Sequence, residues 1–227
     1  RDADLQLANG ASGLEPDVKV RYPIIPGSGY SGMVVTTGSR ASRFWAGQKV
    51  AGIATDGCGE CPACSEGDWP HCPGREAPAA GGQGAYAQYL VTRTSQVHKL
   101  PLDTPLIHGV LVESVARCLR GLDLLEVKPG LRACVVGAGS LGNLCAQLLR
   151  VCGLKVTTVD RDAHWLPLLY KYDIDTDTQL SALDRFDYLV ETSGNQDTLS
   201  HLIEGAGPSS RVLLLGDNDP WDYRSLP

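Results

Sequence analysis

The chain has 227 residues, of which 43% are hydrophobic and 20% are charged. This composition is that of a globular protein with enough apolar sequence for one or two domains, and it argues against disordered and fibrous classes. A net charge of −6, without a long run of Lys or Arg, disfavours nucleic acid as a partner. No uninterrupted apolar stretch could cross a bilayer, and the first residues lack the apolar core of a secretory signal, so we expect no membrane partner.

The first half of the chain is rich in glycine and proline and contains short apolar runs. This pattern predicts an irregular, mainly β domain over residues 1–108, with strands at 32–36, 48–53, 87–91 and 97–100. Apolar residues then recur at helical spacing, which predicts a helix over residues 107–125.

A cluster of cysteines interrupts this first domain. Cys58-Gly-Glu-Cys61-Pro-Ala-Cys64 is followed, after seven residues, by Cys72. Four thiolates can surround one Zn²⁺ as a tetrahedron with Zn–S distances of about 2.3 Å, and such a site is closed to water and substrate. Two disulfides or free thiols are the alternative, but the spacing favours zinc. We therefore expect one structural Zn²⁺ in a lobe over about residues 57–73.

The remaining four cysteines are scattered through apolar segments, at positions 118, 134, 145 and 152. Cysteines distributed in this way are typical of small buried apolar residues, and a chain of this size folds without disulfides. We therefore expect a reducing, cytoplasmic environment.

A glycine-rich turn follows a predicted strand at residues 133–136 and opens a predicted helix at residues 141–151. Its sequence is Gly137-Ala-Gly139-Ser140-Leu141-Gly142. The first glycine permits a tight turn, the second lets a pyrophosphate approach the backbone, and the third lets helix and strand pack closely. The free N–H groups at the start of the helix would face the phosphates.

The next predicted strand, residues 155–159, ends at Asp160. A carboxylate at this place can accept hydrogen bonds from the adenine ribose and would repel a 2′-phosphate, which favours NAD over NADP. The neighbouring Arg161 acts in the opposite direction. An ordinary turn in a sheet that binds no nucleotide is the alternative.

Strands and helices continue to alternate after Asp160. Helices are predicted at residues 163–171 and 198–204, and strands at residues 187–191 and 211–215. Such alternation is typical of a parallel sheet with right-handed crossovers, here over residues 109–227.

These features together resemble the medium-chain dehydrogenase family of zinc-containing alcohol dehydrogenases, particularly its polyol and threonine dehydrogenase-like branch. The resemblance implies an α/β protein in which a GroES-like, mainly β catalytic domain with a four-Cys zinc lobe accompanies a Rossmann dinucleotide-binding domain. It also implies a cleft for the substrate and a homodimer. The segments that carry it, besides the cysteines and the glycine turn, are residues 22–35 (YPIIPGSGYSGMVV), 44–50 (FWAGQKV), 82–90 (GQGAYAQYL), 111–113 (LVE) and 127–130 (VKPG).

The family also uses a second zinc, which polarises the alcohol oxygen while hydride passes to NAD. Its ligands come from a Cys before a Ser/Thr-Asp pair and from a His-Glu pair after Pro-Gly. The matching residues here are Arg1, Ser28 and Gly29, none of which replaces the missing ligands. Glu113 matches a carboxylate near the metal in the polyol branch, but one carboxylate does not hold catalytic zinc. We therefore predict that the second zinc is absent; a local salt bridge is the alternative role for Glu113.

The sequence thus favours an NAD(H)-dependent oxidoreductase acting on a hydroxyl or ketone of a polar small molecule. Without catalytic zinc, the candidate catalytic residues are Ser28 as a hydrogen-bond donor and Glu113 as a general base. Two alternatives stay open. One is a redox-neutral enzyme that uses the same cleft and bound NAD, and the other is a non-catalytic zinc-binding scaffold.

Overall fold

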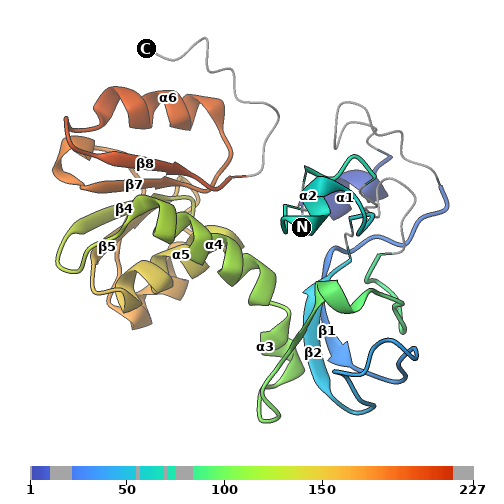
Figure 1. Ribbon diagram of the computed structural model, residues 1–227. Helices are drawn as coiled ribbons and strands as arrows, with labels where there is room; N and C mark the ends of the chain where they lie inside the picture. The colour runs from blue at the N-terminus through green and yellow to red at the C-terminus, as the bar shows by residue number, and fades with distance from the viewer. Residues whose placement is uncertain (1, 11–21, 55–56, 69–70, 75–83, 217–227) are drawn as a thin grey trace. The chain divides into compact units, whose positions relative to one another are not determined.

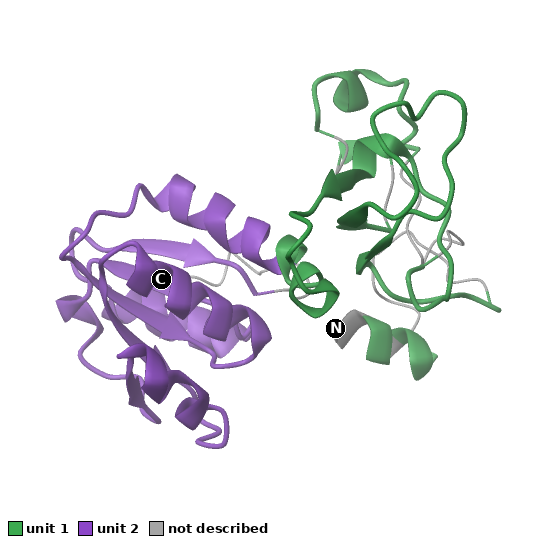
Figure 2. Ribbon diagram, turned by 90° about the horizontal axis from the view of Figure 1, so that it is seen from below, with its two compact units in different colours: residues 1–113 green, residues 114–227 purple. Residues whose placement is uncertain are grey.

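The computed structural model describes residues 2–10, 22–54, 57–68, 71–74 and 84–216. The chain divides into two compact units, residues 1–113 and residues 114–227, which are coloured separately in Figure 2. Each unit has its own sheet. Among the described residues, no helix is both long and apolar enough to span a membrane.

Unit 1 is built on a small antiparallel sheet with the strand order β1-β2-β3. Phe44, Val50 and Val97 are buried together and form its core. The helices of this unit are short, and α3 packs on β1 and β2. The strands are β1 (Gly29–Met33), β2 (Lys49–Ile53) and β3 (Val97–Lys99), and the helices are α1 (Asp2–Ala8), α2 (Pro62–Ser65), the 3-10 helix η3 (Thr94–Gln96) and α3 (Leu106–Gly109).

Unit 2 contains a five-stranded parallel sheet with the strand order β6-β5-β4-β7-β8 (Figure 1). From β4 the chain moves outward to β5 and β6, and it then returns to the other side of β4 to form β7 and β8. The order therefore reverses at β4 and β7, and the carboxyl ends of strands at such a switch point are where ligands bind in open α/β sheets. The strands are β4 (Arg132–Val136), β5 (Lys155–Val159), β6 (Asp175–Asp177), β7 (Tyr188–Glu191) and β8 (Arg211–Leu214).

Helices cover both faces of this sheet, because successive strand residues point to opposite sides. Ala133 and Val135 are buried with residues of α4 (Val112–Leu125) and α5 (Ser140–Val151). Cys134 and Val136 are buried on the opposite face, with α6 (Gln196–Gly205). Figure 1 shows this arrangement of helices on either side of the sheet. Two 3-10 helices complete the unit, η4 (Leu166–Tyr172) and η5 (Leu183–Arg185).

Several expected elements differ from the structure. Residues 87–91 do not form a strand: Val91 is 96% exposed, and no described strand pairs with this segment. An apolar run becomes a strand only where a neighbour accepts its backbone hydrogen bonds. The helix expected over residues 107–125 is interrupted after Gly109, and the expected helix at 163–171 is the 3-10 helix η4.

Candidate functional site

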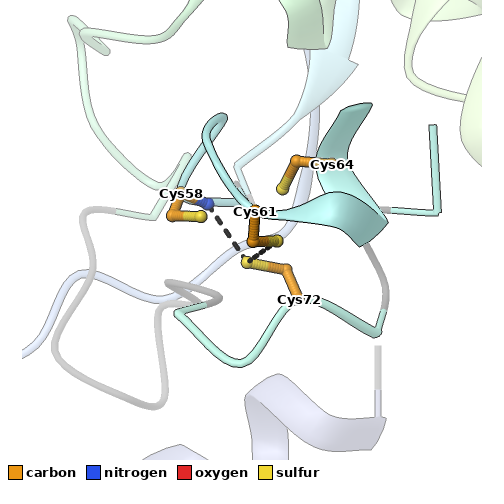
Figure 3. Close-up of side chains that lie close together, drawn as sticks. All are labelled: Cys58, Cys61, Cys64 and Cys72. Atoms are coloured by element: carbon orange, nitrogen blue, oxygen red, sulfur yellow. Dashed lines mark hydrogen bonds between the residues drawn. The ribbon is translucent and has the colours of Figure 1, made fainter. Parts of the chain in front are cut away.

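The four clustered cysteines meet around one point (Figure 3). Cys58 and Cys61 precede α2, Cys64 lies within it, and Cys72 is in the loop that follows. All four sulfurs lie within 4.8 Å of one another, and the Cys61 and Cys72 sulfurs are 3.7 Å apart. A tetrahedron with Zn–S distances of about 2.3 Å has edges of about 3.8 Å. The sulfurs are therefore spaced as a four-coordinate zinc site requires.

The thiols of this cluster differ in acidity. Backbone hydrogen bonds from Glu60 and Cys61 lower the pKa of the Cys58 thiol to about 7. The backbone of Gly59 acts to lower the pKa of Cys64, but burial and the neighbouring sulfurs outweigh it and raise this pKa to about 12. One thiol is thus close to ionisation at neutral pH, whereas another needs a cation to lose its proton.

The glycine turn lies between β4 and α5, at the switch point of unit 2. Gly137 has a φ of +100°, a conformation that favours glycine. A Cβ on Gly142 would lie 1.9 Å from the Gly137 carbonyl oxygen, so α5 approaches the turn more closely than a side chain allows. A Cβ on Gly139, in contrast, would meet nothing within 4 Å. The turn is closed at its first and third glycines and open at its second.

The start of α5 has no side-chain cap. Gly139 is the N-cap, and the exposed Ser140 and half-buried Leu141 begin the helix. Backbone N–H groups at an uncapped helix start form a site for an anion, because they have no intrahelical acceptor. The open side of the turn at Gly139 is therefore also the side that can hold a phosphate.

Asp160 follows β5 and reaches the same turn. Its Oδ2 accepts a hydrogen bond from the Ala138 N–H at 2.6 Å, and its Oδ1 accepts one from the Asp162 N–H at 2.9 Å. A carboxylate oxygen can accept more than one hydrogen bond, so ribose hydroxyls could still bind here. Arg161 is exposed beside it.

The loop after β7 forms hydrogen bonds that support the glycine turn. These contacts were not among the predictions made from the sequence. Thr192 Oγ1 donates to the Val136 carbonyl at 2.8 Å. A Cβ on Gly137 or on Gly142 would lie 2.6 Å from Thr192 Oγ1. Glu191, which is fully buried, accepts hydrogen bonds from the N–H groups of Ser193 and Gly194 at 2.7 and 2.9 Å. Polar residues directly after a buried strand were the signal in the sequence, since such residues lie beside the other strand ends.

The candidate catalytic residues lie in unit 1. Gly109 lets α3 pack closely on β1, because a Cβ there would be 2.8 Å from the Ser31 Cβ. This packing brings Glu113 beside Gly29: the Glu113 Cβ is 4.0 Å from the position of a Cβ on Gly29. Ser28, directly before Gly29, is half-buried, and its carbonyl accepts a hydrogen bond from Ala54.

Asp4 lies at the other end of the same turn, where its Oδ1 accepts a hydrogen bond from the Gly27 N–H at 2.8 Å. The sequence segments around residues 4, 28 and 113 therefore meet within unit 1. Arg1, which aligns with the family's cysteine ligand, lies outside the described residues.

Comparison with known proteins finds alcohol and polyol dehydrogenases that are similar to most of the chain. Residues 2–102 match the alcohol dehydrogenase GroES-like domain. Galactitol 1-phosphate 5-dehydrogenase from Escherichia coli K12 is 28% identical over 208 residues, which cover 86% of this chain and 60% of that protein. The crystal structure of galactitol-1-phosphate dehydrogenase from Escherichia coli superposes with a TM-score of 0.82 at 26% identity, covering 97% of this chain and 66% of that one.

The chain is thus similar to zinc-dependent alcohol and polyol dehydrogenases of the medium-chain dehydrogenase family. A further relative is cinnamyl alcohol dehydrogenase 7 from Arabidopsis thaliana, which is 30% identical over 172 residues that cover 69% of this chain and 45% of that protein. The chain thus spans about 60% or less of the length of these two sequence relatives.

Similarity to the medium-chain dehydrogenase family agrees with the two folds found here, a GroES-like domain and a Rossmann-like parallel sheet. Four sulfurs at the observed spacing fit a structural zinc in a member of this family. The turn around Ser28 and Gly29, unlike the cysteine cluster, offers no usual zinc ligand, because zinc is seldom bound by a serine hydroxyl and glycine has no side chain.

Proposed function

We propose that the chain is an NAD(H)-dependent oxidoreductase of the zinc alcohol dehydrogenase type, acting on a hydroxyl or ketone of a polar small molecule. The observation that carries this proposal is the glycine turn at the switch point, open at Gly139 and closed at Gly142. A turn of this shape admits a pyrophosphate to the start of α5. NAD supplies the hydride acceptor when it is bound. The names of the relatives, such as galactitol 1-phosphate 5-dehydrogenase, support a polyol-like substrate.

The proposed cofactor-binding residues surround this turn. The backbone of the turn and of the helix start would hold the pyrophosphate, through Gly137, Gly139, Ser140, Leu141 and Gly142. Asp160 would accept hydrogen bonds from the adenine ribose, and its charge would repel a 2′-phosphate, which gives a preference for NAD. Arg161 would offset part of this repulsion.

The metal content that we propose is one structural zinc per chain. Cys58, Cys61, Cys64 and Cys72 would hold it, and four sulfurs leave no position for a substrate. A second zinc would have to be held near Ser28, Gly29 and Glu113, where the described donors are one hydroxyl and the carboxylates of Glu113 and Asp4. Such a set does not fit a catalytic zinc, which needs three protein ligands of imidazole, thiolate or carboxylate type.

Ser28 and Glu113 would therefore do the work of the missing metal. In this proposal Ser28 donates a hydrogen bond to the substrate oxygen, and Glu113 accepts the proton of the substrate hydroxyl. The position of Glu113 beside Gly29 supports this role, because its Cβ lies next to the turn that carries Ser28.

A redox-neutral enzyme is the second candidate. The residues at positions 28 and 29 favour it, because the loss of metal ligands beside an intact glycine turn also fits an elimination or epimerisation that uses bound NAD without net turnover.

A homodimer in the cytoplasm is our proposal for the assembly and location, on the strength of the family resemblance and the scattered, unpaired cysteines.

Titration with NADH and NADPH tests the nucleotide assignment. The native protein should bind NADH more tightly than NADPH. Asp160→Asn should lower the ratio of the two dissociation constants roughly tenfold, because it removes a carboxylate charge that repels the 2′-phosphate of NADPH by about 1.4 kcal/mol. Asp162→Asn, which changes an exposed neighbouring carboxylate, should leave the preference unchanged. Tighter binding of NADPH to the native protein would contradict the role of Asp160, and no binding of either nucleotide would favour a scaffold.

Incubation with NAD and a panel of polyols and polyol phosphates tests the reaction class. The expected result is formation of NADH with at least one of them, abolished by Glu113→Gln. Copurified nucleotide without net formation of NADH would support the redox-neutral candidate instead.

A further inference from the structure

Arg93 lies outside the cysteine cluster in sequence, yet its guanidinium reaches the loop that carries the first metal ligand. Its Nη1 donates to the Gly57 carbonyl at 3.0 Å and to the Cys58 carbonyl at 2.7 Å. Two consecutive carbonyl groups are therefore held by one nitrogen of a charged side chain.

The first of these contacts fixes the direction of an N–H group. The carbonyl and the N–H of a trans peptide point in opposite directions, because the peptide is planar. With the Gly57 carbonyl turned toward Arg93, the Cys58 N–H of the same peptide points away from it, toward the Cys72 sulfur at 3.2 Å. Figure 3 shows this N–H···S contact as a dashed line.

The second contact acts in the same way on the next peptide. The Cys58 carbonyl is held by Arg93, which fixes the orientation of the peptide that carries the Gly59 N–H. Gly59 has a φ of +80°, and a Cβ on it would lie 2.9 Å from the Arg93 Nη1. Glycine at position 59 therefore permits both the turn and the close approach of the guanidinium.

Hydrogen bonds to a metal-bound thiolate, and positive charge near it, stabilise a site in which four thiolates outweigh the two charges of Zn²⁺. We propose that Arg93 is a positioning residue of the metal lobe, which holds the Gly57–Cys58 and Cys58–Gly59 peptides in the orientation in which the Cys58 N–H donates to the Cys72 sulfur. The inference rests on the proposed zinc at the four cysteines and adds a side chain that holds the ligand loop through two backbone carbonyls.

Competition with a chromogenic chelator, in the full chain loaded with zinc, measures the effect. Arg93→Met should weaken zinc binding about 10- to 100-fold, the usual cost of losing an outer partner of a metal ligand. Arg93→Lys, which keeps the charge but can hold fewer carbonyls, should restore part of this loss. Arg40→Met removes the same charge from an exposed loop of the same unit and should match the native protein.

Two further readouts separate positioning from a general effect on folding. The zinc-free forms of the native protein and of Arg93→Met should unfold at the same temperature, while the gain on adding zinc is smaller in the variant. The thiolate-to-metal absorption of the cobalt-substituted protein should also change in Arg93→Met and not in Arg40→Met.

A zinc affinity of Arg93→Met within about fivefold of the native value would overturn the inference. If this variant does not fold, an affinity of Arg93→Lys equal to the native value would overturn it. Absence of zinc binding by the native chain is a different result, because it would remove the proposed metal site itself.

Discussion

The three glycines of the glycine turn, Gly137, Gly139 and Gly142, differ in what a side chain would meet there. Gly142 is in van der Waals contact with the turn, and a Cβ would overlap the Gly137 carbonyl oxygen. Gly139 faces open space. One glycine is therefore required by the fold, and the other is required only if something else occupies the space above it.

Substitution of these two glycines by alanine separates the two requirements. Gly142→Ala should destabilise the protein by about 3 kcal/mol or more, because backbone must move. Gly139→Ala should cost about 1 kcal/mol or less, as an uncapped N-cap position allows, yet weaken NADH binding at least about tenfold, since a loss of about 1.4 kcal/mol at the pyrophosphate suffices. Thermal unfolding and nucleotide titration measure both. Native-like affinity in Gly139→Ala would show that no phosphate approaches this glycine.

At the scale of elements, the carboxyl ends of β4 and β7 act together. The Thr192 hydroxyl, after β7, joins the loop to the last residue of β4, and Glu191 holds the following N–H groups. The glycine turn is thus supported by β7, which starts 56 positions after the start of β4. Parallel pairing of β4 with β7 makes this contact possible.

Two threonine-to-valine changes test this support. Thr192→Val removes the hydrogen bonds to the turn and should cost about 1 kcal/mol of stability, with weaker NADH binding. Thr158→Val is the matched control: the Thr158 hydroxyl is buried and has no hydrogen-bond partner among the described residues, so its loss should be neutral or slightly stabilising. Equal effects of the two changes on NADH affinity would contradict a specific role for Thr192.

The metal lobe gives a prediction about pH. Zinc binds thiolates, so protons compete with the metal. With pKa values of about 7 for Cys58 and about 12 for Cys64, at least one thiol must lose its proton on binding at neutral pH. The apparent zinc affinity should therefore rise as the pH increases from about 6 to about 8, with release of protons that calorimetry in two buffers detects. An affinity independent of pH in this range would be inconsistent with thiolate ligands.

Strands could be predicted from the sequence where an apolar, strand-like segment also had a neighbouring strand to pair with. The apolar runs at β4, β5, β7 and β8 had both a strand-like composition and neighbours to pair with. The run at residues 87–91 had the composition alone, and β6, with the sequence DTD, had a partner without an apolar pattern. Composition reports the side chains of a strand, whereas pairing depends on the rest of the fold.

At the scale of the whole molecule, the sequence was most informative where spacing reflects chemistry. The cysteine spacing predicted a cluster that the structure brings within 4.8 Å, and the glycine spacing predicted a turn at a switch point. The contacts of Arg93 and Thr192 could not be predicted, because they join segments 35 and 56 residues apart through side chains with no motif. Such contacts depend on tertiary packing.

The two units carry different chemistry. Unit 1 holds the cysteine cluster and the turn of Ser28, and unit 2 holds the nucleotide turn. We propose for the whole chain a single zinc held by four sulfurs, a nucleotide at the glycine turn, and no zinc at Ser28 and Glu113.

The zinc content of the purified protein tests this claim most directly. Elemental analysis should find one zinc per chain in the native protein, one in Cys152→Ser, and almost none in Cys64→Ser, because only the last change removes a ligand. Two zincs per chain, with one retained in Cys64→Ser, would contradict the account, since a second metal would then be held by side chains that it excludes.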